Sequence, residues 1–125
     1  MSEVTKRRIF VVDDEESIVD SLTGIFNSYG FDAIPFTDPL KAFEAAQVQC
    51  PDLLLADIIM PQLNGVDLAM QFSDLYPHCK ILLLSGNANS QGLLAIAKAE
   101  GHNFYLASKP AHPRELIETI ESMIN

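Results

Sequence analysis

The chain of 125 residues contains no tryptophan and only two cysteines. Cys50 and Cys79 stand alone and far apart, a pattern that fits neither a zinc site nor a disulfide framework. We therefore expect two unpaired thiols, buried or half-buried, in a reducing compartment.

Positive charge is also scarce, with 8 lysines and arginines against 17 aspartates and glutamates and a net charge of −9. A domain this acidic repels polyanions, so we expect no direct binding to nucleic acid.

Long apolar runs are missing as well. The longest, such as Ile81–Leu84, fall far below the ~18 residues of a membrane-spanning helix. The basic stretch Lys6–Arg8 precedes only four apolar residues, too few for a secretory signal. These absences predict a cytoplasmic chain that does not contact a membrane.

What is present is the composition of a globular domain, with 48% hydrophobic and 20% charged residues. The length allows one domain with a single core and is too short for two. No repeat, low-complexity stretch or flexible linker divides the sequence, so we interpret residues 1–125 as a single domain.

Short apolar runs alternate with helical patterns along the chain. The runs predict strands at Ile9–Val12, Leu53–Ala56, Ile81–Leu84 and Phe104–Ala107, with a weaker strand at Asp32–Phe36 that Pro35 marks as an edge. The helical patterns cover residues 18–29, 38–47, 66–75, 90–100 and 113–124. Gly30 supplies a helix stop, and Asp38-Pro39 supplies a helix start.

This alternation predicts an α/β fold: a doubly wound, flavodoxin-like parallel sheet of five strands with five helices on its two faces. The leucine runs at 53–55 and 82–84 suit central strands that are covered on both sides. In such folds ligands bind at the carboxyl ends of the strands.

Chemically active side chains follow four of the predicted strands. Asp13 and Asp14 follow the first, Asp57 the third, Ser85 the fourth and Lys109 the fifth. Each alone is typical of a turn, a helix cap or a solvated surface, but their coincidence at one edge of the sheet favours a site. Three carboxylates in one cleft repel one another unless a hard cation such as Mg²⁺ lies between them. With a lysine and a hydroxyl, the set predicts a carboxylate nucleophile that accepts a phosphoryl group.

Four segments carry a resemblance to a known family: residues 9–15 (IFVVDDE), residues 57–65 (DIIMPQLNG), Ser85-Gly86 and Lys109-Pro110. In this order and spacing they resemble the receiver domain of two-component response regulators, including single-domain receivers similar to the chemotaxis regulator. The resemblance implies a phosphorelay protein that is not an enzyme, although it assists its own phosphorylation and dephosphorylation. The implied phosphoryl donor is a sensor histidine kinase or a histidine phosphotransfer protein.

The resemblance also implies a phosphoacceptor and a metal site. Asp57 would accept the phosphoryl group. Mg²⁺ would be bound directly by Asp14, by Asp57 and by the backbone carbonyl of Ile59, and mainly through water by Asp13.

Further roles follow from the same resemblance. Lys109 would pair with Asp57 and then with the phosphoryl group, to which Ser85 would donate a hydrogen bond. A cis peptide is implied between Lys109 and Pro110, which is admissible because the second residue is proline. Gly65 is expected where a side chain would be costly.

The sequence departs from the family in the last predicted strand. The family's aromatic switch residue usually stands three positions before the lysine, where this chain has Leu106, while Tyr105 is four positions before it. Either Tyr105 is the switch and a bulge near Ala107-Ser108 absorbs one extra residue, or Leu106 occupies the position; we favour Tyr105. His112 is expected to be a surface loop residue.

Three functions are compatible with the motifs. We favour a stand-alone receiver over the N-terminal receiver of a longer regulator with a DNA-binding or enzymatic output. A haloacid-dehalogenase-type phosphohydrolase is the remote third, because it needs an Asp-x-Asp motif and Asp57 is followed by Ile58-Ile59. The output surface is expected within residues 90–125, where the small residues of Leu94–Ala99 suit contacts with a partner or with a second copy in a phosphorylation-dependent homodimer.

Overall fold

Strands and helices alternate from the first strand to the last helix, as the sequence predicts. The computed structural model describes residues 6–60, 64–86, 91–102, 104–108 and 112–124. The elements are β1 (Arg8–Val12), α1 (Glu16–Ser28), β2 (Asp32–Phe36), α2 (Pro39–Val48), β3 (Leu53–Asp57), α3 (Gly65–Leu75), β4 (Lys80–Ser85), α4 (Gln91–Ala99), β5 (Tyr105–Ser108) and α5 (Pro113–Ile124). Within this described part, no helix combines the length and the apolar character needed to cross a membrane.

The five strands form one parallel sheet in the order β2-β1-β3-β4-β5, which confirms the predicted doubly wound fold. The winding direction reverses between β1 and β3, whose register runs from Ile9 opposite Leu53 to Val12 opposite Ala56. Asp13 and Asp57 are the next residues along these two strands. They therefore lie at the switch point of the sheet, where parallel α/β folds bind ligands.

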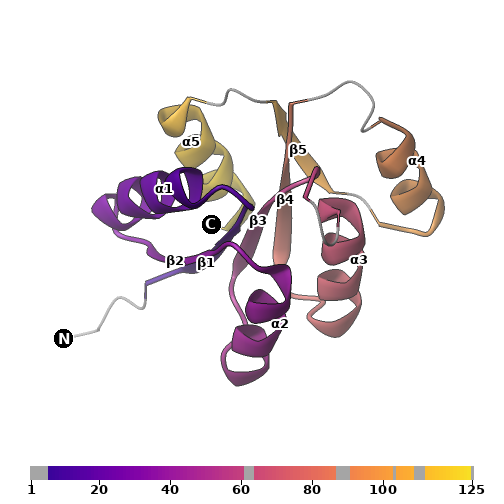
Figure 1. Cartoon of the computed structure of the whole chain (residues 1–125), viewed down its shortest axis with the longest axis horizontal. Helices are drawn as coiled ribbons and strands as arrows, with labels where there is room; N and C mark the ends of the chain where they lie inside the picture. Colours follow the sequence, from indigo (N-terminus) through magenta and orange to yellow (C-terminus); the bar gives the residue numbers. More distant parts are fainter. Residues whose placement is uncertain (1–5, 61–63, 87–90, 103, 109–111, 125) are drawn as a thin grey trace.

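Helices cover both faces of the sheet (Figure 1). On one face, α1 and α5 pack against a cluster that includes Leu55 and Leu82. On the other face, α2, α3 and α4 pack against a cluster that includes Leu54 and Leu83. Adjacent residues of a strand point to opposite faces, so the leucine runs of β3 and β4 are buried from both sides, as predicted.

The predicted start and stop signals act where the sequence places them. Asp38 caps α2, because its carboxylate accepts a hydrogen bond from the Leu40 amide at 2.9 Å, and Pro39 is the first helical residue. Gly30, with a φ of +94°, follows the C-cap of α1. β2, which contains Pro35, lies at an edge of the sheet.

Both cysteines are free, as predicted, but only Cys79 is buried. Burial raises the pKa of the Cys79 thiol to about 12. Cys50 is exposed rather than half-buried, because it lies in the connection between α2 and β3; partial desolvation and then the nearby Asp52 raise the pKa of its thiol as well. Both thiols therefore stay protonated at neutral pH, which disfavours a nucleophilic or metal-binding role.

The cap of α2 makes a testable contribution to stability. Asp38→Ala removes the acceptor of the Leu40 amide, so we expect the free energy of unfolding to fall by about 1 kcal/mol. Urea denaturation followed by circular dichroism measures this change. Glu44→Ala, at an exposed position of the same helix, should change it by less than ~0.5 kcal/mol. Equal losses in the two variants would contradict the capping role.

Candidate functional site

Three carboxylates meet at the carboxyl edge of β1 and β3. Asp13 and Asp14 follow β1 directly, and Asp57 is the last residue of β3. Each offers an oxygen atom, and these three oxygens lie within 4.8 Å of one another. Asp13 and Asp57 are buried, at 2% and 8% exposed, whereas Asp14 is exposed to solvent. The structure thus brings together the carboxylates that the strand ends predict.

Backbone amides hold the two buried carboxylates in place. The Glu15 amide donates to Oδ1 of Asp13 at 3.0 Å, and the Ile59 amide donates to Oδ1 of Asp57 at 3.2 Å. The chain after Asp57 is anchored in turn, because the Ile58 amide donates to a main-chain carbonyl of β4 at 3.0 Å. Neighbouring strands therefore set the separation of the carboxylates, which cannot move apart without breaking these bonds.

Two helices begin beside the cluster. α1 begins at Glu16, two residues after Asp14, and α3 begins at Gly65, which packs on the backbone of Asp57. The positive end of a helix dipole stabilises a nearby negative charge by about 0.3–1 kcal/mol. The two helix N-termini thus offset part of the repulsion between the carboxylates.

Gly65 makes the closest backbone contact of the site. Its amide donates to the Ile58 carbonyl at 2.7 Å. A Cβ atom at this position would overlap the carbonyl oxygen of Asp57 and would lie 2.7 Å from its carbonyl carbon. The expectation that a side chain is costly at Gly65 is therefore confirmed. The reason is close approach rather than a left-handed backbone, because Gly65 does not have a positive φ.

The other predicted site residues are placed in part. Ser85 ends β4 half-buried, one residue beyond the register partner of Asp57. Ile59 is 53% exposed beside Asp57, whose carboxylate its amide contacts. Lys109 and Pro110, with their predicted cis peptide, lie outside the described residues.

Tyr105 and Leu106 begin β5, which lies at an edge of the sheet. The pairing of β5 with β4 is unbroken from Tyr105 to Ser108, so the bulge expected at Ala107-Ser108 is absent from this part of the strand. β5 pairs with β4 in regular parallel register over these four residues, so no extra residue has to be absorbed there. Tyr105 and Leu106 point to opposite faces and are 57% and 45% exposed, so either can still serve as the switch residue.

Two histidines make side-chain contacts outside the carboxylate cluster. His112 is exposed, as predicted, and its Nδ1 atom accepts a hydrogen bond from the Arg114 amide at 3.2 Å at the start of α5. His102, which no sequence pattern singled out, lies with Nε2 3.0 Å from Oδ1 of Asp74. These two residues are 28 positions apart with no periodicity between them, so the sequence offered no signal for the contact.

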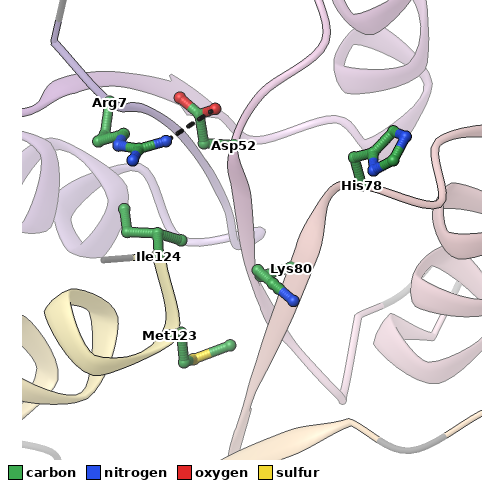
Figure 2. Close-up of a pocket in the computed structure, with 6 residues that line it drawn as sticks. All are labelled: Arg7, Asp52, His78, Lys80, Met123 and Ile124. Atoms are coloured by element: carbon green, nitrogen blue, oxygen red, sulfur yellow. Dashed lines mark ion pairs between the residues drawn. The ribbon is translucent and has the colours of Figure 1, made fainter.

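A separate pocket of about 230 Å³ opens at the end of the sheet where the strands begin, opposite the end that carries the three carboxylates (Figure 2). Its lining consists of Arg7, Asp52, His78, Lys80, Met123 and Ile124. Figure 2 shows Arg7 paired with Asp52, at 3.9 Å, while the Lys80 nitrogen points away from this pair. Its polar groups do not converge as the three carboxylates do, so the carboxyl edge is the candidate site.

The chain resembles proteins of one family in sequence and in structure. The family model of the response regulator receiver domain matches residues 9–121. The response regulator receiver protein CpdR of Brucella abortus is 30% identical, over 94% of this chain and 97% of its own length. The alkaline phosphatase synthesis transcriptional regulatory protein PhoP of Bacillus subtilis is 31% identical, over 94% of this chain and 48% of its own length.

Solved structures agree with these relatives. A CheY-like response regulator receiver domain protein from Methanospirillum hungatei superposes with a TM-score of 0.86 at 27% identity, covering 96% of this chain and 94% of the other. The chain thus matches nearly the whole of some receiver proteins, whereas it spans about half the length of several curated relatives.

The close approach at Gly65 is testable by substitution. Gly65→Ala should lower the free energy of unfolding by about 1–3 kcal/mol, because the new Cβ atom must displace the main chain of Asp57. Gly24→Ala is the matched control, because Gly24 lies inside α1 with open space around its Cβ position. That variant should raise the free energy of unfolding by about 0.5–1 kcal/mol. Urea denaturation of both variants decides the matter: effects of the same sign and size would contradict the close contact.

Proposed function

The chain belongs to the family of response regulator receiver domains, and we propose that it is a phosphoryl-accepting switch whose acceptor is Asp57. Receiver domains take phosphoryl groups from histidine kinases and regulate effector domains, generally as switches rather than as catalysts. The observation that carries the proposal is the buried Asp57 carboxylate beside two further carboxylates at the switch point of the sheet. Because the chain belongs to this family, we no longer consider the alternative that it is a phosphohydrolase.

Receiver domains bind Mg²⁺ at an acidic pocket, and the donor set of this chain fits that ion. Mg²⁺ prefers hard oxygen ligands and retains several waters. In the proposed site, Asp14, Asp57 and the backbone carbonyl of Ile59 would hold the ion directly, and Asp13 would hold it through water. When bound, the ion neutralises the clustered charge and orients the phosphoryl oxygens.

Asp57 is proposed to act as the nucleophile. One of its carboxylate oxygens bonds to phosphorus while the bond between phosphorus and the imidazole nitrogen of the donor histidine breaks, and that nitrogen keeps the electron pair. The Ile59 amide keeps the carboxylate oriented. We assign to Lys109 the positive charge that holds the transferred oxygens, and to the Ser85 hydroxyl a hydrogen bond to one of them.

We propose that the chain acts as a stand-alone receiver in the cytoplasm, with the receiver domain of a longer regulator as the alternative. CpdR, which the chain matches over 97% of its length, supports the first form. PhoP and the Escherichia coli transcriptional regulatory protein CreB, of which the chain spans 48% and 51%, support the second. In either form the phosphoryl donor would be a sensor histidine kinase or a histidine phosphotransfer protein. The net charge of −9 disfavours direct contact of this domain with nucleic acid.

The output surface is proposed to comprise α4, β5 and α5. Ser85 precedes the segment that leads to α4, and Lys109 follows β5, so both groups that would contact the phosphoryl oxygens adjoin these elements. Ile96, Tyr105 and Leu106 expose large apolar side chains there. They offer a contact area for an effector or for a second copy, and we propose either Tyr105 or Leu106 as the switch residue.

The metal site predicts saturable binding of Mg²⁺. In an NMR titration, the Glu15 and Ile59 amides should show the largest shifts, because they donate to the carboxylates of the cluster. Asp14→Ala should weaken binding by about tenfold or more, because it removes one ligand. Asp20→Ala, at an exposed position of α1, is the control and should bind as the native chain does. Native affinity in the Asp14 variant would place the site elsewhere.

The phosphoacceptor is testable with a small donor. Acetyl phosphate with Mg²⁺ should add one phosphoryl group that hydroxylamine removes, because an acyl phosphate is the product at a carboxylate. Asp57→Asn should take up none, and Asp20→Asn should take up the native amount, as measured by intact-protein mass spectrometry. Labelling that persists in the Asp57 variant would assign the nucleophile to another residue.

A further inference from the structure

His102 joins the end of α3 to the connection between α4 and β5. Its Nε2 atom lies 3.0 Å from Oδ1 of Asp74 on α3, and its side chain is 13% exposed. The ring also packs at a tilt on Phe104, with the ring centroids 5.6 Å apart. Because an ionised carboxylate only accepts hydrogen bonds, Nε2 carries the hydrogen in this contact.

The main chain of His102 closes α4. Its amide donates to the Ala97 carbonyl at 2.9 Å, and the Gly101 amide donates to the Lys98 carbonyl at 3.0 Å. Gly101 has a φ of +90°, the left-handed conformation typical of a residue that ends a helix. Any displacement of the end of α4 therefore moves His102, and with it the start of β5.

α3 provides the fixed side of the contact. Its first residue, Gly65, packs on the main chain of Asp57, and its residues Leu68 and Phe72 are fully buried in the core. α4 is held less firmly, since Ala97 is the buried side chain among those described for this helix and Ile96 is 55% exposed. With fewer buried contacts, α4 is the side that moves more easily.

The contact between His102 and Asp74 is weak enough to be reversible. Asp74 is 72% exposed, so water screens its charge. Nδ1 of His102 is buried without a hydrogen-bond partner in the described structure, a cost that opening would remove by admitting water. A pocket of about 310 Å³, lined by Phe104 and Tyr105 among others, adjoins His102 and leaves space for such a rearrangement.

We propose that the His102–Asp74 contact is a latch that holds α4 and the start of β5 against α3 in the unphosphorylated protein and opens when these elements rearrange. The inference rests on the proposed function, because the phosphorylation switch supplies the second arrangement of α4 and β5. His102 and Asp74 are both positioning residues, since neither belongs to the carboxylate cluster. If the latch is removed before phosphorylation, the second arrangement of α4 and β5, which favours the phosphoryl group, becomes more populated.

Removing the Asp74 carboxylate, to which His102 donates its hydrogen bond, tests the latch. Asp74→Ala should bind the phosphoryl mimic beryllofluoride, with Mg²⁺ and followed by NMR, roughly two- to fivefold more tightly than the native chain, the range set by a hydrogen bond to a solvent-screened carboxylate. Without the mimic, amide exchange over residues 94–102 and 104–108 should quicken, while β1 and β3 exchange as before. Asp74→Asn keeps an oxygen acceptor and should restore most of the native behaviour. His78→Ala removes an exposed histidine outside the latch and should change neither measurement.

Each other outcome is decisive. Native affinity for the mimic in Asp74→Ala overturns the latch and leaves the proposed function intact. Faster exchange that extends over β1 and β3 also overturns it, because it reports a general loss of stability. If the native chain binds no beryllofluoride with Mg²⁺, the proposed function fails and the latch fails with it. His102→Gln, which keeps an N–H donor, must behave as Asp74→Asn does; tighter binding equal to that of Asp74→Ala would also contradict the latch.

Discussion

Asp13 and Asp57 are buried close together at the ends of two adjacent strands, and the repulsion between their charges shapes the rest of the site. The strands cannot relieve it by separating, because β1 and β3 pair in continuous register up to these residues. Relief comes from local groups: two backbone amides donate to the carboxylates, and α1 and α3 begin beside them. Hydrogen bonds to charged groups contribute about 1.5–3 kcal/mol each, and a helix N-terminus less. A divalent cation with a preference for oxygen would stabilise a site built in this way further, which connects the electrostatics of the fold to the chemistry proposed for it.

Gly65 connects these electrostatics to the packing of the core. Because it has no side chain, α3 begins in contact with the backbone of Asp57, and the helix then buries Leu68 and Phe72 against the sheet. The carboxylate of Asp57, the proposed acceptor, is therefore buried against a well-packed helix, whereas the neighbouring Asp14 is exposed to solvent. A change of charge at Asp57 cannot be absorbed by movement of α3 without loss of buried contacts. In the proposed switch, the response would pass to α4 and β5, whose described side chains are less buried.

Most of the fold and the carboxylate cluster could be predicted because each depends on a local or periodic signal. Leu53–Leu55 forms a continuous apolar run, which fits a strand covered on both sides, and parallel strands bring Asp13 and Asp57 to one edge. Features set by contacts between distant residues could not be predicted. The His102–Asp74 contact joins residues 28 positions apart, and the alignment of Tyr105 depends on strand pairing that no run of letters encodes. The exposure of Cys50 likewise depends on how α2 ends, not on the thiol itself.

The free energy required for switching is too large for the His102–Asp74 contact alone and has to come mainly from contacts to the phosphoryl group. Moving an equilibrium from 1:99 to 99:1 requires about 5.5 kcal/mol of differential stabilisation. The His102–Asp74 contact, whose carboxylate is screened by solvent, contributes at most about 1 kcal/mol, so it can adjust the starting population but cannot reverse it. The larger share must come from contacts that exist only when phosphoryl oxygens are present, since phosphorylation adds about −1.5 to −2 charges. Charge-assisted hydrogen bonds contribute about 1.5–3 kcal/mol each, so two near the upper value, or three near about 2 kcal/mol, would reach the required total. On the proposed assignment, neither Ser85 nor Lys109 alone would supply it, so one group would be needed from the end of β4 and another from the residue that follows β5 in the sequence.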